Sequence, residues 1–306
     1  MNIPPYYTKY FQAAEISLEV RSEYPISEKT FHPKFKAFQI SPNGKDRVTI
    51  THHFRSHKYR HPREDWTRVY HKNQWQIYRS EQEWIYHYSS MWPKDLVRSS
   101  TGVMNKDYSS IRIYPDNLKP EEYARGQFTA LTLFNTDQMI FAKLLSDRKG
   151  LMVHANGFSI NGNGILLAGI SGSGKSTLSK MLKSHGHKIL CDDRMFIRKI
   201  NDRFKIFGNW CYGSHPHASP GKAPLQGFCF LRKGDKNRIV QLSRQKDIVP
   251  RLMQVVVKPL LDVHGWEKYL KILAQLKKSI PFYEIEFDLS GHICNKFERH
   301  FQQPPF

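Results

Sequence analysis

The sequence predicts a protein of mixed α+β and α/β character, in which a strand-rich antiparallel N-terminal region precedes a second domain with a mixed sheet. Three observations lead to this fold class. Short β-rich runs separated by turn residues dominate residues 1–125. A glycine-rich segment at 169–177 lies between an apolar run and a segment with helical spacing of its apolar residues. Strand-like and helical patterns then mix over residues 188–287.

Composition sets the broad class of the protein. With 306 residues and a hydrophobic content of 40%, the chain can bury a sizeable core, which excludes wholesale disorder. The sequence has no apolar stretch near the ~20 residues of a membrane span, and the N-terminus lacks the pattern of a secretory signal. The four cysteines are scattered without a C-x-x-C pair, which predicts reduced thiols and a cytoplasmic protein. They are Cys191, Cys211, Cys229 and Cys294.

The charge of the chain is strongly basic. Lys and Arg number 47 against 27 Asp and Glu, which gives a formal net charge of +20. Such an excess favours anionic partners, namely nucleotides, acidic peptides, nucleic acid or an anionic membrane face, although a solvated basic surface without a ligand is the alternative. The sequence disfavours nucleic acid as a partner, because the charge is spread along the chain and no RNA- or DNA-binding signature accompanies it.

The first 125 residues form one predicted region. Alternating or β-rich runs predict strands, and Asn43-Gly44, Asn73 and the segment 115–117 supply turns between them. The predicted strands are 38–40, 48–51, 75–78, 84–88 and 111–114. Residues 126–150 have the apolar spacing of one or two helices, and we expect them to bridge to the next domain.

Residues 151–300 form the second predicted domain, and a short tail at 301–306 follows it. Two apolar runs around Asn161-Gly162-Asn163-Gly164 predict a hairpin, so the strand at 165–168 should pair antiparallel with its predecessor. A helix is expected from Lys175. Further predicted strands are 188–191, 196–200, 204–207, 227–231 and 283–287, and predicted helices are 247–261 and 265–278.

One motif carries the strongest functional signal. The pattern G-x-x-x-x-G-K-[ST] is matched without mismatch by Gly169-Ile170-Ser171-Gly172-Ser173-Gly174-Lys175-Ser176-Thr177, between a strand and a helix as a phosphate-binding loop (P-loop) requires. Its glycines let backbone N–H groups point at phosphate oxygens. Lys175 would reach the β- and γ-phosphates, and Ser176 would hold Mg²⁺. The residues predicted to bind the nucleotide are Gly169, Ser171, Gly172, Ser173, Gly174, Lys175, Ser176 and Thr177.

Two acids follow at a spacing that suits the same site. Asp192 and Asp193 come after the predicted strand 188–191, which would return its C-terminal end to the phosphates. Phosphoryl transfer needs one carboxylate for Mg²⁺ and another that accepts the proton of the attacking hydroxyl, and we expect the two aspartates to divide these tasks. In the alternative, one aspartate caps the next element or pairs with Arg194, so that only one contacts the metal.

Several segments together resemble the HPr kinase/phosphorylase family, which shares its nucleotide-binding fold with ATP-dependent phosphoenolpyruvate carboxykinase. They are the segment His154-Ala155-Asn156-Gly157, the hairpin turn, the stretch 168–177 and the stretch 184–193. The layout of the whole chain is more similar to the stand-alone HPr-kinase-like proteins of bacterial peptide-modification cassettes. The resemblance implies an HPr-kinase-like P-loop domain that uses ATP and Mg²⁺.

The resemblance also implies roles for individual residues. The catalytic residues would be Asp192, Asp193, Lys175 and His154. One aspartate would be the general base, and the metal side would be formed by Ser176 and Asp193. His154 would lie beside the phosphates, where it either hydrogen-bonds the γ-phosphate or packs within the hairpin.

The segment after the acids departs from the family. Family members carry a metal-side glutamate in a glycine-rich segment, whereas residues 207–214 contain no carboxylate. The loop 210–222 is rich in Gly, Pro and His and is a candidate cover for the substrate. Its Cys211, His215 and His217 lack the spacing of a zinc site, so ordinary loop residues are the favoured interpretation.

Two functions follow from these observations. The first is a kinase that transfers the γ-phosphate of ATP to a serine-type hydroxyl of a peptide, protein or small molecule, with an aspartate as base. The second is a nucleotide-binding regulatory or assembly protein of a peptide-modification cassette, which the missing glutamate favours. The basic N-terminal region suits an extended peptide added to a sheet edge, or plain structural support. The sequence does not fix the oligomeric state, and a homo-oligomer is one option.

Overall fold

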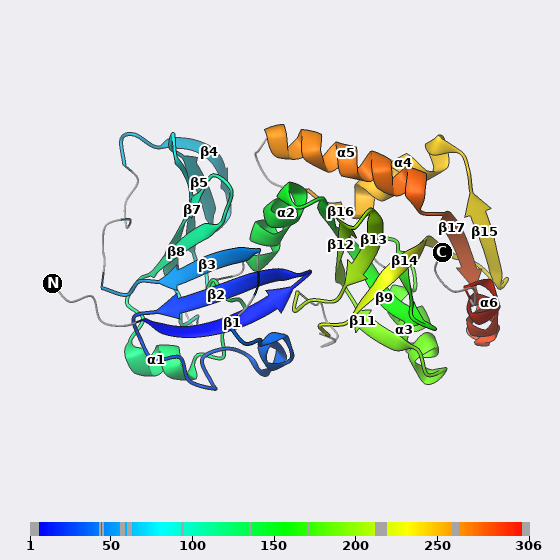
Figure 1. Cartoon of the computed structure of the whole chain (residues 1–306), viewed down its shortest axis with the longest axis horizontal. Coiled ribbons are helices and arrows are strands. Elements are labelled where there is room, and N and C mark those ends of the chain that lie inside the picture. Colours follow the sequence, from blue (N-terminus) through cyan, green and yellow to red (C-terminus); the bar gives the residue numbers. More distant parts are fainter. Residues whose placement is uncertain are drawn as a thin grey trace. The chain divides into compact units, whose positions relative to one another are not determined.

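The computed structural model describes residues 6–42, 44, 46–55, 59, 63–92, 95–134, 136–170, 172–211, 219–258 and 263–301. The chain divides into two compact units, Met1–Ile140 and Phe141–Phe306 (Figure 1). This division lies inside the segment 126–150 that was expected to connect two domains. Both units combine a large sheet with helices, which confirms the mixed α+β character. No helix in the described part of the chain is both long and apolar enough to cross a membrane.

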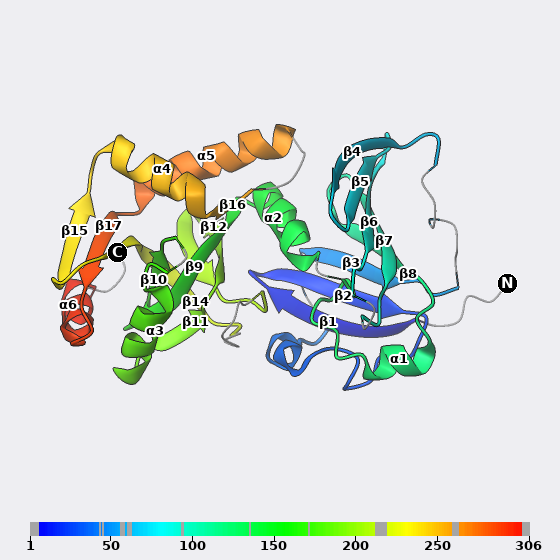
Figure 2. The ribbon, with the colours of Figure 1, turned by 180° about the vertical axis from the view of Figure 1, so that it is seen from behind.

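The first unit is built on an eight-stranded sheet. Its strands are β1 (Tyr7–Ala13), β2 (Ile16–Ser22), β3 (Arg47–His52), β4 (Thr67–Lys72), β5 (Trp75–Arg79), β6 (Glu83–Ser89), β7 (Ser99–Asn105) and β8 (Ser110–Pro115). Their order in the sheet is β1-β2-β3-β8-β7-β6-β5-β4 (Figure 2).

The prediction that this sheet is antiparallel is wrong at its centre. β3 runs parallel to both of its neighbours, β2 and β8, while the outer pairs are antiparallel. The reason is the connection 23–46, which returns the chain to the end of the sheet where β2 began. A strand that starts from that end has to run in the same direction as β2.

The strand expected at 38–40 is reduced to a single β-bridge, in which Gln39 pairs with Phe11 of β1. A short 3₁₀ helix, η1 (Pro33–Phe38), comes before it and ends at the first of the three expected residues. Pro33 occupies its first turn, where the fixed φ of proline suits a helix, and the Nδ1 atom of His32 accepts a hydrogen bond from the N–H of Lys34 at 3.3 Å. Phe35 and Phe38 are both buried, so a spacing of three residues decides the local structure.

Of the one or two helices expected across 126–150, the described residues form one. Helix α1 (Pro120–Arg125) precedes this segment, and helix α2 (Asp137–Asp147) lies within it. The carboxylate of Asp137 accepts hydrogen bonds from the N–H of Leu131 at 2.9 Å and from the N–H and Oγ1 of Thr132 at 3.2 and 2.8 Å. These bonds hold residues 131–132 in a turn, because a side chain that binds backbone N–H groups competes with helix formation.

The second unit contains a mixed nine-stranded sheet. Its strands are β9 (Gly150–Ile160), β10 (Asn163–Ala168), β11 (Lys188–Cys191), β12 (Arg194–Ile200), β13 (Arg203–Phe207), β14 (Lys222–Lys233), β15 (Arg238–Leu242), β16 (Val256–Val257) and β17 (Phe282–Phe287). β9 and β10 pair antiparallel, which confirms the predicted hairpin, and Asn161 and Gly162 have positive φ angles of 49° and 84° in its turn. β14 runs parallel to both β10 and β17.

Helices cover both faces of this second sheet. They are α3 (Lys175–Ser184), α4 (Gln245–Val255), α5 (Val263–Ser279) and α6 (His292–His300). One apolar cluster joins α3 and α6 to the sheet, and another joins α4 and α5 to it, so that the two pairs lie on opposite faces (Figure 1). The short strand β15 and the helix α6 were not predicted, because α6 buries only Ile293, Cys294 and Phe297 among polar residues.

Candidate active site at the ends of three strands

The strand β9 determines which residues meet. On one side of β9, β10 ends at Ala168, which pairs with Ala155. On the other side, Arg194 at the start of β12 pairs with His154. The two aspartates at 192–193 join β11 to β12 and therefore pass the same level of β9. Residues separated by more than twenty positions along the chain are thus brought to one edge of the sheet.

The glycine loop, residues 169–174, connects β10 to the start of α3. Gly172 and Gly174 have φ angles of 75° and 95°, a region that residues with a Cβ rarely adopt. A Cβ at Gly174 would also lie 2.8 Å from the ring of Phe287. The strand, loop and helix therefore follow one another as the motif predicts. Ser171, one of the predicted nucleotide-binding residues, lies outside the described residues.

Lys175 is turned back onto the beginning of the glycine loop. Its Nζ atom donates to the carbonyl oxygens of Gly169 at 2.7 Å and Ile170 at 3.2 Å. Burial lowers the pKa of Lys175, and the negative charge of Asp193 acts against that lowering. The ammonium group therefore interacts electrostatically with Asp193, while its hydrogen bonds go to the loop. Ser176 and Thr177 follow in the first turn of α3, and both are exposed.

Asp193 lies beside two basic side chains, His154 and Arg194. Its Oδ1 atom lies 2.9 Å from Nδ1 of His154, and its Oδ2 atom accepts a hydrogen bond from Arg194. Burial raises the pKa of this carboxyl, but the hydrogen bond with His154 and the charges of Arg194, His154 and Lys175 outweigh it, so the pKa of Asp193 is lowered. Asp193 therefore stays ionised at neutral pH. The pairing with Arg194 that the sequence left open is present.

Two buried polar residues support this arrangement, and the sequence did not single out their contact. The Nδ2 atom of Asn156 donates to Oγ of Ser179 at 2.8 Å, which ties β9 to α3. Asn156 lies two positions after His154 in β9, on the same face of the strand, and Ser179 lies four positions after Lys175 in α3. These spacings were the available signal. The bond fixes the strand that carries His154 against the helix that carries Lys175.

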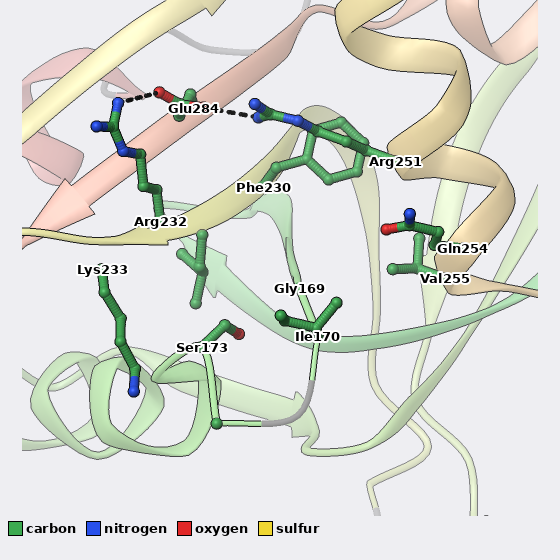
Figure 3. A pocket seen from close by; sticks show the side chains of 12 residues that line it. Gly169, Ile170, Ser173, Phe230, Arg232, Lys233, Arg251, Gln254, Val255 and Glu284 are labelled. Atoms are coloured by element: carbon green, nitrogen blue, oxygen red, sulfur yellow. Dashed lines mark hydrogen bonds and ion pairs between the residues drawn. The ribbon is translucent and has the colours of Figure 1, made fainter.

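A pocket of about 470 Å³ lies beside the glycine loop (Figure 3). Loop residues line one side of it, and residues from β14, β17 and α4 line the rest. Nothing in the sequence pattern indicated it, because its lining comes from four separate segments. Its lining includes Ile170, Ser173, Phe230, Arg232, Arg251 and Glu284.

The loop 210–222 is described only at its ends. Trp210 and Cys211 are buried, and the N–H of Cys211 donates to Oδ1 of Asn209 at 2.6 Å. His215 and His217 lie within 212–218, outside the described residues. Among the residues that the structure describes, no group of three or more His, Cys, Asp and Glu side chains gathers as a metal site.

A magnesium site of the kind expected here does not need such a group. Mg²⁺ at phosphates keeps several water molecules and takes one or two protein ligands. Ser176 and the ionised Asp193 have the hard oxygen donors that Mg²⁺ prefers, and they are the residues that could hold it.

The fold and the site define an α/β protein in which a strand, a glycine loop and a helix lie beside an acid–histidine pair. A model of the family described as SynChlorMet cassette protein ScmC matches residues 122–302, more than half of the 306-residue chain. The chain therefore belongs to this family, whose description names a cassette and no activity.

Other comparisons add little to this assignment. Among solved structures, the Hpr(Ser) kinase/phosphatase from Coxiella burnetii is weakly similar, with a TM-score of 0.30 and 13% sequence identity, over 49% of this chain and 88% of that chain. A similarity this weak carries no conclusion about activity. No match was found among curated proteins.

Proposed function

We propose that this protein is an ATP- and Mg²⁺-dependent kinase that transfers the γ-phosphate to a serine-type hydroxyl of a peptide, protein or small molecule. The observation that carries this proposal is the meeting of the glycine loop, Lys175, His154 and Asp193 at the ends of neighbouring strands. A phosphate anchor and an oriented carboxylate are the two parts that phosphoryl transfer requires.

The binding roles follow from the positions of the residues. The N–H groups of the glycine loop and of the first turn of α3 would hold the phosphates, favoured by the helix dipole. Lys175 would exchange its bonds to Gly169 and Ile170 for bonds to the β- and γ-phosphates. Ser176 and Asp193 would hold Mg²⁺, which supplies charge neutralisation of the phosphate oxygens when it is bound.

The transfer step assigns different tasks to the two aspartates. The acceptor oxygen attacks the γ-phosphorus, the bond from that phosphorus to the β–γ bridging oxygen breaks, and ADP leaves with the electron pair. Asp192 would take the proton of the acceptor, because Asp193 is already paired with His154 and Arg194 and is assigned to the metal. His154 would orient Asp193 through Nδ1, and with hydrogen on both ring nitrogens it would also donate from Nε2 to a γ-phosphate oxygen.

The reaction would take place in the cytoplasm. All four cysteines are buried and free, as reduced conditions require. Peptides encoded in the same cassette are the first acceptors to test.

The test uses the full chain with γ-labelled ATP, Mg²⁺ and peptides encoded beside its gene. Wild type is compared with Asp192→Asn and Asp193→Asn, and ATP binding is measured in parallel. We expect labelled peptide with wild type and a loss of labelling with both variants. ATP binding without transfer or hydrolysis in wild type would overturn the kinase and leave a nucleotide-binding regulatory protein.

A further inference from the structure

The pocket beside the glycine loop lies on the side of β10 that faces away from the acids. β10 has β9 on one side, with His154 and the connection to Asp193 beyond it. On its other side lies β14. Ala168 of β10 pairs with Phe230 of β14, and Phe230 in turn pairs with Glu284 of β17. The pocket is lined by residues from these last two strands.

This arrangement gives a bound triphosphate a direction. If the terminal phosphate lies at Lys175 and Asp193, the opposite end of the molecule has to leave the loop on the β14 side. Four residues of the glycine loop also line the pocket, so a group attached to the phosphates enters it directly. Its volume of about 470 Å³ falls in the range of small-molecule sites, roughly 300–1,000 Å³.

The lining suits a flat heteroaromatic group. Ile170 is 70% exposed and offers an uncovered apolar side chain at the mouth of the pocket. The guanidinium carbon of Arg251 lies over the ring of Phe230, 5.9 Å from its centre, within the range of a cation–π contact. An apolar side chain and a planar guanidinium can cover the two faces of a base.

Polar groups at the edge of the pocket are held in place. Glu284 forms ion pairs with Arg251 at 2.7 Å and with Arg232 at 3.5 Å, and Figure 3 shows the two arginines reaching it from opposite sides. Such a carboxylate can accept a hydrogen bond from an exocyclic amino group. The hydroxyl of Ser173 is buried and has no hydrogen-bond partner in the described part of the chain, which is unusual without a ligand.

We propose that this pocket holds the nucleoside of the bound nucleotide, with its base between Ile170 and Arg251 and its amino edge toward Glu284. This inference rests on the proposed function, since it takes the glycine loop as the phosphate site. It assigns the pocket to the nucleotide and thereby places the acceptor hydroxyl on the opposite, β9 side of β10.

The experiment separates the nucleoside from the phosphates. Calorimetric titration of the full chain compares Mg²⁺·ATP with Mg²⁺·tripolyphosphate, which has no base or ribose. The test variant is Gln254→Trp, because Gln254 is an exposed residue of α4 that lines the pocket, and an indole there fills it. The matched control is Val249→Trp on the same helix, 42% exposed and outside the lining.

We expect ATP to bind wild type about tenfold or more tightly than tripolyphosphate. In Gln254→Trp, the affinity for ATP should fall to the affinity for tripolyphosphate, while the affinity for tripolyphosphate should not change. Val249→Trp should bind both ligands as wild type does. Adenosine should displace ATP from wild type and Val249→Trp but not from Gln254→Trp, whose pocket is filled. Arg251→Ala is the second test variant, and it should lower the affinity for ATP but not that for tripolyphosphate.

The outcomes distinguish this inference from the proposed function. Equal ATP affinity in wild type and in both pocket variants would overturn the nucleoside site while leaving the loop as phosphate site. Two results together would instead overturn the phosphate site itself. Tripolyphosphate would fail to bind wild type, and Lys175→Ala would bind ATP with the affinity of wild type.

Discussion

Two strand histidines, one in each unit, show how surroundings decide the role of the same residue type. His52 of β3 is fully buried, with Nε2 2.8 Å from the carbonyl oxygen of Leu131 and Nδ1 3.0 Å from the hydroxyl of Tyr123. His154 of β9 has a side chain 37% exposed and lies 2.9 Å from Asp193. The first is satisfied by neutral groups and stabilises a core, whereas the second faces ionised groups at a strand end.

The difference suggests a criterion that separates a candidate functional histidine from a structural one. Burial lowers the pKa of His52 to about 4, so that it is neutral at pH 7, where its tautomer with hydrogen on Nε2 donates to Leu131 and accepts from Tyr123. His154 shares its strand end with an acid, an arginine and the glycine loop. A polar side chain with its full set of neutral partners points to stability, and one among charges at a strand end points to chemistry.

The largest expected effect is the loss of phosphoryl transfer on removal of Lys175, which tests whether the second unit carries the proposed activity. Lys175→Ala removes the proposed phosphate contact, and we expect transfer from γ-labelled ATP to fall by about 10²–10³-fold. Lys180→Ala, an exposed lysine on the same helix, is the control and should keep the rate within about twofold, because exposed charges contribute little. Equal rates in the two variants would contradict the role of Lys175.

The next largest effect is the pH dependence of stability that buried His52 should cause. His52 has a folded pKa of about 4 against an ordinary value of 6.5, so the unfolded chain takes up the proton first as the pH falls. The stability of the first unit should therefore be complete above pH 6.5 and fall by about 3 kcal/mol as the pH drops toward 4. Urea unfolding at several pH values measures it.

His52→Gln is the control for this pH dependence. Glutamine does not titrate, so the variant should be less stable at neutral pH but show a weaker dependence on pH between 6.5 and 4. An unchanged pH dependence in the variant would assign the effect to other groups.

A smaller effect tests the other histidine. His154→Asn should lower the transfer rate by about 10- to 100-fold, because Asp193 loses its orienting partner, while the unfolding free energy changes by less than about 1 kcal/mol. His185→Asn, at the exposed end of α3, should change neither quantity. A large loss of stability with an unchanged rate would make His154 a packing residue like His52.

The smallest effect concerns the bond that ties β9 to α3. Ser179→Ala leaves the buried amide of Asn156 without its acceptor, which should lower stability by about 1–2 kcal/mol and the transfer rate only severalfold. Ser184→Ala, on the exposed end of the same helix, is the control. Thermal unfolding and the labelling assay measure the two quantities, and a variant as stable as the control would show that the bond is dispensable.

The sequence predicted those features that depend on a few neighbouring residues. Asn161-Gly162 fixed the hairpin through its turn, and the spacing around Lys175 fixed the helix after the glycine loop. The parallel position of β3 could not be predicted in the same way, since it depends on where the connection 23–46 leads the chain. The strand expected at 38–40 is only a bridge at Gln39, because two buried phenylalanines three residues apart extend a helical turn to Phe38.

The candidate site was predictable as a set of residues but not as a geometry. Asp193 and His154 are 39 positions apart, and their contact follows from the pairing of β12 with β9, which no local pattern contains. The pocket depends on β14, β17 and α4 meeting beside the loop, so it depends on packing over about 115 residues, from Gly169 to Glu284. These features are set by tertiary contacts that a single sequence does not display.

The eleven residues of β9 pair with four other strands, namely β10, β11, β12 and β16. Successive side chains of a strand point to opposite faces, so deleting one residue before His154 would reverse the face to which that imidazole points and disturb the ladders to its neighbours together. Natural variation in length should therefore collect in the loops and spare this segment, and a designer who wishes to insert a tag or sensor has to look elsewhere.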